Sequence, residues 1–195
     1  MSILRAILLG VSFLALAPVI FASSAADEPN PFRKTYLHFG LASNTPEGRT
    51  QSNLSPGRLQ PAFAYLHNID THWIMGLGGG LKTFERPNRL LLPPSRTLAI
   101  WTLRHSTSYV VRLSHPSYLL FGPQLLYLLP TTTGKPPPQR DHWYEAEVGV
   151  GLSVELIRGM SDRWFLSLRA ERWRGTKTSR LAGFETGFGI MVALD

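Results

Sequence analysis

The stretch from Trp143 to Arg158 limits most strongly what this chain can fold into. Its even-numbered positions from Tyr144 to Leu156 are all apolar, whereas its odd-numbered positions from Glu145 to Glu155 are Glu, Gly or Ser. A period of two places these two sets on opposite faces of an extended strand. A helix would mix the two sets around its circumference, so the segment predicts a long β-strand.

The same alternation, of varying clarity, runs along the rest of the chain. In addition to 143–158, we predict strands at residues 34–44, 58–68, 72–84, 97–113, 118–130, 163–174 and 184–194. Pro61 weakens the pattern in one of them, and residues 118–130 are apolar on both faces except for Gly122 and Gln124. The 17 Gly and 15 Pro residues are typical of a chain with many turns between short elements.

The links between these strands alternate in length. The links at 67–71, 114–117 and 159–162 are short, whereas those at 45–57, 85–96, 131–142 and 175–183 are longer and rich in Pro, Gly and charge. A transmembrane barrel with short periplasmic turns and longer outer loops has this layout. The predicted strands also reach the roughly 9–11 residues that cross a bilayer at a tilt.

The first 26 residues have the layout of a secretory signal peptide. Arg5 precedes an apolar run, Pro18 interrupts that run, and small residues follow it. We expect cleavage after Ser24-x-Ala26, with Ala22-x-Ser24 as the alternative site, and an uncleaved anchor as the competing interpretation. The expected organisation is a signal peptide at 1–26 and one barrel domain at 27–195.

The polar face of the strands carries charges of both signs. We predict that a lumenal network pairs them, because buried charges require partners. Its expected members are Lys82, Arg104, Arg112, Glu145, Glu147, Glu155, Arg169, Glu171 and Glu185. Eight strands enclose a space that side chains can fill, so a plugged lumen is favoured over an ion path or gate made from the same pairs.

Tryptophan residues lie near the predicted strand ends. We interpret them as two aromatic girdles at the membrane interfaces, with packing at the rim of a soluble barrel as the alternative. The predicted girdle residues are Trp73, Trp101, Trp143, Trp164 and Trp173.

This layout resembles the small eight-stranded outer-membrane barrels, the class of OmpX and the transmembrane domain of OmpA. The C-terminal run from Gly189 to Leu194 is similar to the assembly signal of that class, although Leu194 and Asp195 replace the usual terminal aromatic residue. The resemblance implies insertion by the barrel-assembly machinery into the outer membrane of a Gram-negative bacterium. It further implies a role as a structural anchor, as an adhesion or interaction surface, or, in a few cases, as a lipid-acting enzyme.

One segment suggests catalysis. His105 and Thr107 are expected on the outward face, and lipid A deacylases of the PagL type carry a His-x-Ser pair there together with a Glu. Here Thr107 replaces Ser, and no outward Glu follows on the next strand. A polar interruption of the outward face is the alternative. The six His residues show no metal-binding spacing, and the chain has no Cys.

The predicted outer loops are basic, and the chain carries a formal net charge of +7. Export argues against nucleic acid as the partner. Lipopolysaccharide phosphates fit better, because Arg and Lys bind phosphate well; a solvated loop set is the alternative. The candidate residues are Arg86, Arg89, Arg96, Lys135, Arg140, Lys177 and Arg180.

The sequence therefore predicts an all-β protein, a monomeric eight-stranded antiparallel up-and-down transmembrane β-barrel. Its expected role is structural or surface-interacting, with no cofactor, no metal, no wide pore and outer-membrane lipid as its surroundings. Three alternatives remain: a lipid A-modifying hydrolase using His105, a narrow channel, and a soluble periplasmic lipocalin-like binder of an apolar ligand. The last would reverse the two faces, placing Trp and Leu inside; the low charged fraction of 17% favours the membrane version.

Overall fold

The computed structural model describes residues 35–47, 55–85, 97–132, 146–176 and 181–194. The predicted signal peptide at 1–26 lies outside these ranges. The strands are β1 (Thr35–Pro46), β2 (Ser55–Pro56), β3 (Gln60–Asn68), β4 (Trp73–Glu85), β5 (Thr97–Ser114), β6 (Ser117–Thr132), β7 (Glu147–Gly159), β8 (Trp164–Gly175) and β9 (Ala182–Leu194). Within the same ranges, no helix is long and apolar enough to cross a membrane.

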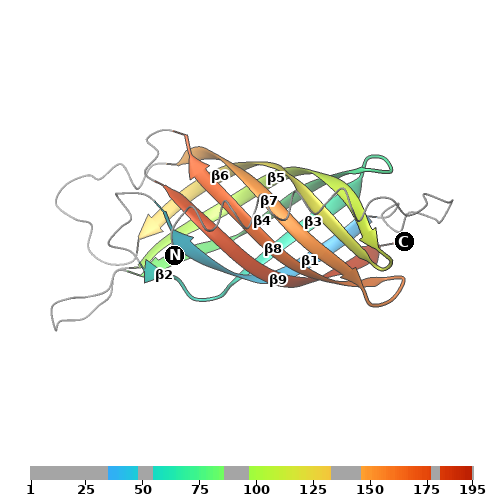
Figure 1. The fold of residues 1–195 in the computed structure, drawn as a ribbon. Helices are drawn as coiled ribbons and strands as arrows, with labels where there is room; N and C mark the ends of the chain where they lie inside the picture. Colours follow the sequence, from blue (N-terminus) through green and yellow to red (C-terminus); the bar gives the residue numbers. More distant parts are fainter. Residues whose placement is uncertain (1–34, 48–54, 86–96, 133–145, 177–180, 195) are drawn as a thin grey trace, which may run out of the picture. The chain divides into compact units, whose positions relative to one another are not determined.

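Eight of these strands form one closed antiparallel barrel (Figure 1). β1, β3, β4, β5, β6, β7, β8 and β9 each pair with their sequence neighbours, and β1 pairs with β9 from Thr35↔Leu194 to Pro46↔Gly183 to close the sheet. The two-residue β2, which the alternation did not predict, pairs only with the end of β4. The prediction of an all-β, eight-stranded, antiparallel barrel is confirmed.

Short turns join the strands at one end of the barrel. Between β3 and β4, the Asp70 carboxylate accepts hydrogen bonds from the backbone N–H groups of His72 and Trp73, at 2.7 and 2.9 Å. Between β7 and β8, the Ser161 hydroxyl accepts from the N–H of Trp164 at 3.3 Å. Such side-chain bonds favour tight turns over continued extended backbone. We call this the short-turn end and the opposite one the long-loop end.

The outward face of the barrel is apolar. Among the large apolar residues of the barrel strands, Leu152, Leu168 and Phe63 are the most exposed, at 68%, 61% and 58%. Soluble monomers rarely expose apolar residues on this scale. The reversed arrangement, with Trp and Leu filling the lumen and charges outside, is therefore wrong.

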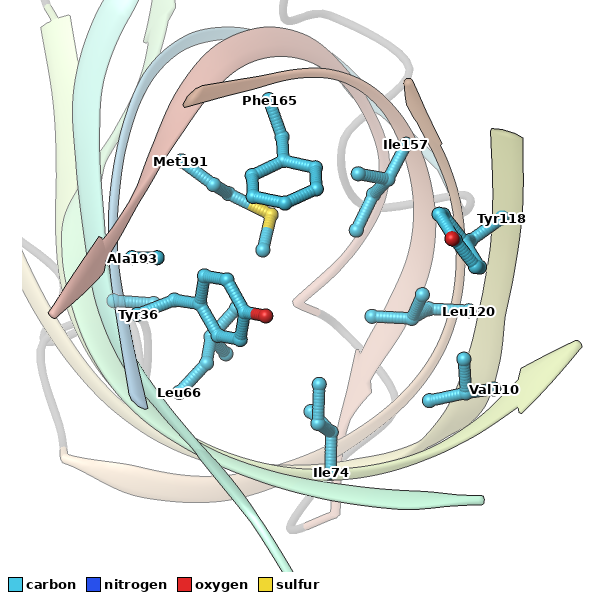
Figure 2. Close-up of a cluster of buried hydrophobic side chains, with 11 residues drawn as sticks. Tyr36, Leu66, Ile74, Val110, Tyr118, Leu120, Ile157, Phe165, Met191 and Ala193 are labelled. Atoms are coloured by element: carbon cyan, nitrogen blue, oxygen red, sulfur yellow. The ribbon is translucent and has the colours of Figure 1, made fainter. Parts of the chain in front are cut away.

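The lumen contains two apolar layers separated by a polar one. The first lies at the short-turn end, where inward side chains from all eight barrel strands, Tyr36, Phe165 and Met191 among them, form one buried cluster (Figure 2). The second lies toward the long-loop end and contains Phe84, Leu98, Ile100, Leu126, Leu128, Trp173 and Leu181. Interior side chains thus fill the barrel at two levels.

Strand β6 explains why residues 118–130 are apolar on both faces. Its outward side chains join the apolar exterior, whereas its inward Tyr118 and Leu120 belong to the first layer and Leu126 and Leu128 to the second. Gln124 is buried between these two pairs, at the polar level. The strand supplies both layers.

Candidate functional site in the barrel interior

Three cations and three carboxylates meet between the apolar layers. Lys82 comes from β4, Arg104 from β5, Glu155 from β7 and Glu185 from β9, while β8 supplies both Arg169 and Glu171. All are buried except Glu155, which is mostly covered. The formal charges of the six sum to zero. Ion pairs join five of them, as buried charges require, whereas Glu155 lies 3.6 Å from Nε2 of His38.

Glu171 is the centre of this layer. Its side chain is 1% exposed. One oxygen lies 3.2 Å from Nη1 of Arg104 and also pairs with Arg169, and the other lies 3.5 Å from Nζ of Lys82. Three cations therefore share one carboxylate, which ties β4 and β5 to β8 across the lumen.

Glu185 completes the network on the β9 side. Its carboxylate pairs with Lys82 and accepts a hydrogen bond from Arg169 at 2.6 Å. Lys82 additionally lies 5.2 Å from the centre of the Trp173 ring and 3.5 Å from Oδ1 of Asn44. The cation–π contact joins the charged layer to the apolar layer above it.

A second polar group lies beside the network. Nε2 of His38 is 2.8 Å from the Ser167 hydroxyl and 3.6 Å from Oε1 of Glu155. Ser, His and an acidic residue are the residue types of the catalytic triad in serine hydrolases. In that triad one imidazole nitrogen contacts the Ser hydroxyl and the other contacts the carboxylate. Here one nitrogen faces both, and both apolar layers enclose the group, so the arrangement is structural.

A glycine makes room for this histidine. A Cβ at Gly189 would clash with Nε2 of His38, and would lie 2.6 Å from the carbonyl oxygen of Phe39. Only a residue without a side chain fits beneath the imidazole. Among the described residues, no group of three or more His, Asp or Glu could hold a metal ion.

Three predicted lumenal residues stand apart from the charged layer. Glu147 is buried near the long-loop end, where a Cβ at Gly175 would meet its carboxylate. Arg112 is exposed: β5 continues past the first apolar layer toward the short-turn end, so its assignment to the buried network is wrong. Glu145 lies outside the described residues.

Three of the five predicted girdle residues have the expected orientation. Trp73, Trp101 and Trp164 are exposed and outward. Trp73 also packs edge-on against Tyr109, with ring centres 5.1 Å apart. Trp143 lies outside the described residues.

Trp173 is not a girdle residue. It is 1% exposed and sits inside the second apolar layer, 6.4 Å from the Phe84 ring, with Gly183 directly beneath its indole. The prediction is wrong because the alternation along β8 places Arg169, Glu171 and Trp173 on the same inward face.

His105 and Thr107 lie on the outward face, as their parity predicts. The residues opposite His105 are Leu77 on β4 and Leu125 on β6, and Met75 lies opposite Thr107. These ladder partners supply no carboxylate to orient His105, which a histidine base requires.

The seven basic loop residues predicted to bind lipopolysaccharide, Arg86, Arg89, Arg96, Lys135, Arg140, Lys177 and Arg180, all lie outside the described residues. A pair of described cations was missed instead: Arg172 and Arg174 are exposed on the outward face of β8. The same alternation that places Leu166 and Leu168 outward predicts their position.

Comparisons with known proteins bear on the fold alone. No family model matches the chain, and no curated protein matches it. The chain is similar to the crystal structure of Neisserial surface protein A, with 11% identity, a TM-score of 0.63, and coverage of 82% of this chain and 97% of that one. It is also similar to the outer membrane protein OprG of Pseudomonas aeruginosa, with 8% identity, a TM-score of 0.53 and coverage of 82% and 93%.

A further match is the attachment invasion locus protein Ail of Yersinia pestis, with 8% identity, a TM-score of 0.43 and coverage of 83% and 97%. The fold that this chain shares with Neisserial surface protein A and OprG is that of the small eight-stranded outer-membrane barrels. The resemblance inferred from the alternating strands and their links is therefore confirmed at the level of fold.

Proposed function

We propose that this protein resides in the outer membrane of a Gram-negative bacterium, as a closed barrel that acts through its surface or as a structural element of the envelope. The observation that carries the proposal is the combination of an apolar exterior with a lumen filled at two levels. The exterior suits the hydrocarbon region, where only closed barrels and helices satisfy their backbone groups.

The filled lumen argues for a surface role over transport. A solute entering from the long loops meets the layer with Trp173 and Phe84, then the paired charges, then the layer with Tyr36 and Phe165. Each layer would have to part, and the ion pairs between them would have to separate. We therefore expect no steady conductance from the folded barrel.

The route to the membrane forms part of the same proposal. Cleavage of residues 1–26 would release a chain whose last strand, β9, ends in the assembly-signal-like run Gly189–Leu194. In the described chain, β9 pairs with β1 from Gly183 to Leu194. Recognition of β9 by the barrel-assembly machinery would precede that pairing.

Fractionation of cells expressing the full chain tests the proposal. We expect recovery in the outer-membrane fraction, a mobility shift between unboiled and boiled samples on SDS gels, and a mass corresponding to loss of residues 1–26. Planar bilayers containing the purified protein should show no stable open level. Recovery as a soluble periplasmic protein, or a reproducible conductance step, would contradict it.

A further inference from the structure

The outward face of β8 changes character abruptly. From the short-turn end it presents Trp164, Leu166, Leu168 and Ala170, and then Arg172 and Arg174. The ladder partners of Arg172 are the exposed Leu152 and Phe184, and Arg174 lies opposite Val150. Two guanidinium groups thus emerge from an otherwise apolar surface.

The position of this pair matches one edge of an apolar band. At about 3.3 Å per residue and a strand tilt of about 40°, Arg174 lies roughly 25 Å above Trp164. That is about the height of the lipid-facing band of outer-membrane barrels. If Trp164 marks the inner interface, Arg174 lies at the outer one. Arg172 lies two residues lower on β8, and a long, flexible Arg side chain allows its guanidinium group to extend toward the same interface.

The charge of the pair is only half compensated. Nε of Arg172, whose side chain is 75% exposed, lies 2.9 Å from Oε2 of Glu47. Within the part of the chain that the structure describes, no carboxylate pairs with Arg174. A cation on a lipid-facing surface is stabilised by an anion. Arg174 can therefore bind an anionic group from outside the protein.

We propose that Arg172 and Arg174 form a binding site for the phosphate groups of an outer-leaflet lipid. Guanidinium groups bind phosphate oxygens bidentately. The two side chains stand on one strand face, about 7 Å apart along β8, and the apolar residues below them accommodate acyl chains. Glu47 competes with the lipid for Arg172. The site rests on the proposed membrane location.

The test uses the full mature chain, folded in zwitterionic detergent and titrated with diphosphoryl lipid A under native mass spectrometry. We expect wild-type protein to retain the lipid, and R172Q/R174Q to bind it about 30-fold more weakly, given about fivefold per interfacial cation. E47Q should bind more tightly than wild type, because it frees Arg172. Without its phosphates, lipid A should bind the wild-type protein and R172Q/R174Q with equal affinity.

The matched control is R158Q/R163Q, which removes two exposed arginines near the opposite end of the β7–β8 hairpin. It should leave lipid A affinity unchanged. Equal loss in both double variants, or wild-type affinity in R172Q/R174Q, would overturn the proposal. Displacement of lipid A by equimolar inorganic phosphate would also overturn it, because the site would then take free phosphate rather than lipid.

Heat-dependent mobility on SDS gels checks that every variant is folded before titration. Cell fractionation and lipid titration together distinguish failure of the proposed function from failure of the lipid site. A wild-type chain absent from the outer membrane contradicts the proposed function, whereas a correctly located chain whose Arg variants bind lipid A normally contradicts only this site.

Discussion

Glu171→Gln offers the most direct test of how the barrel is held together. The substitution keeps the size of the side chain and one acceptor oxygen, replaces the other oxygen with an NH2 donor, and removes the charge. The six-charge layer then carries one net positive charge, with Lys82, Arg104 and Arg169 left around a neutral amide. Removing one partner from a buried ion pair typically costs 3–5 kcal/mol, and because Gln still accepts a hydrogen bond we expect about 3 kcal/mol, the lower end of that range.

The same change at Glu47 is the control. Glu47 also pairs with an arginine, at 2.9 Å from Arg172, but on the exposed outer surface. Exposed ion pairs contribute about 0–1 kcal/mol, so E47Q should cost less than about 1 kcal/mol. The two variants differ in burial while sharing the substitution and the type of partner.

Urea titration of barrels refolded into phosphatidylcholine vesicles measures both, with tryptophan fluorescence and the unboiled SDS band as independent signals. With a slope of about 2 kcal/mol per molar urea, E171Q should lower the unfolding midpoint by about 1.5 M, and E47Q by less than about 0.5 M. Equal shifts in the two variants, or a shift below 0.5 M for E171Q (an approximate bound from the same slope), would refute the central role of Glu171.

A double variant tests directly whether Arg104 and Glu171 stabilise one another. R104Q/E171Q restores charge balance in the layer, so its cost should fall short of the summed single costs by about 1 kcal/mol or more, within the range seen for contacting residues. Additive costs would mean that Arg104 and Glu171, 3.2 Å apart, do not stabilise one another.

Three further outcomes follow from the structure. Trp173→Ala should destabilise the barrel by about 3–5 kcal/mol, because the indole fills the second apolar layer; the urea midpoint measures this, and a shift no larger than that of E47Q would contradict it. Gly189→Ala should cost about 1–3 kcal/mol, since its methyl group would clash with His38; an unchanged heat-dependent mobility shift and urea midpoint would show that the imidazole can move away freely. His105→Ala should leave the acyl-chain pattern of lipid A unchanged by mass spectrometry, because the residues opposite it are leucines; a changed pattern would restore the hydrolase hypothesis.

The alternation predicted the strands and their faces because a period of two has few other physical solutions. It predicted the inward face of Lys82, Arg169 and Glu185, since each lies on the face opposite the outward apolar residues of its strand. It could not predict that Lys82 and Glu185, more than a hundred residues apart, would meet, because cross-lumen contact depends on the stagger between strands. Strand β2 was missed for a related reason: two residues are too short to show any period.

The errors at Trp173 and Arg112 have a common origin. In both cases a residue type was given priority over its position: Trp was assigned to an interface, and Arg to a buried ion pair. Parity alone places Trp173 inward, and distance along β5 alone places Arg112 beyond the first apolar layer. Position on the strand determines both locations. In a barrel, parity decides whether a side chain points inward or outward, and distance along the strand decides its level along the barrel axis.

The layered lumen connects these observations to function. Paired charges alone would leave a polar interior that water and small ions can enter, whereas apolar layers alone would supply no directional contacts across the lumen. In this barrel the charged layer joins β4, β5, β8 and β9 by named ion pairs, and the layers above and below exclude solvent from it. Excluding water strengthens each pair, so the interior is suited to rigidity. A rigid barrel with a filled interior leaves its outer surface, including the Arg172–Arg174 pair, as the part that can engage a partner.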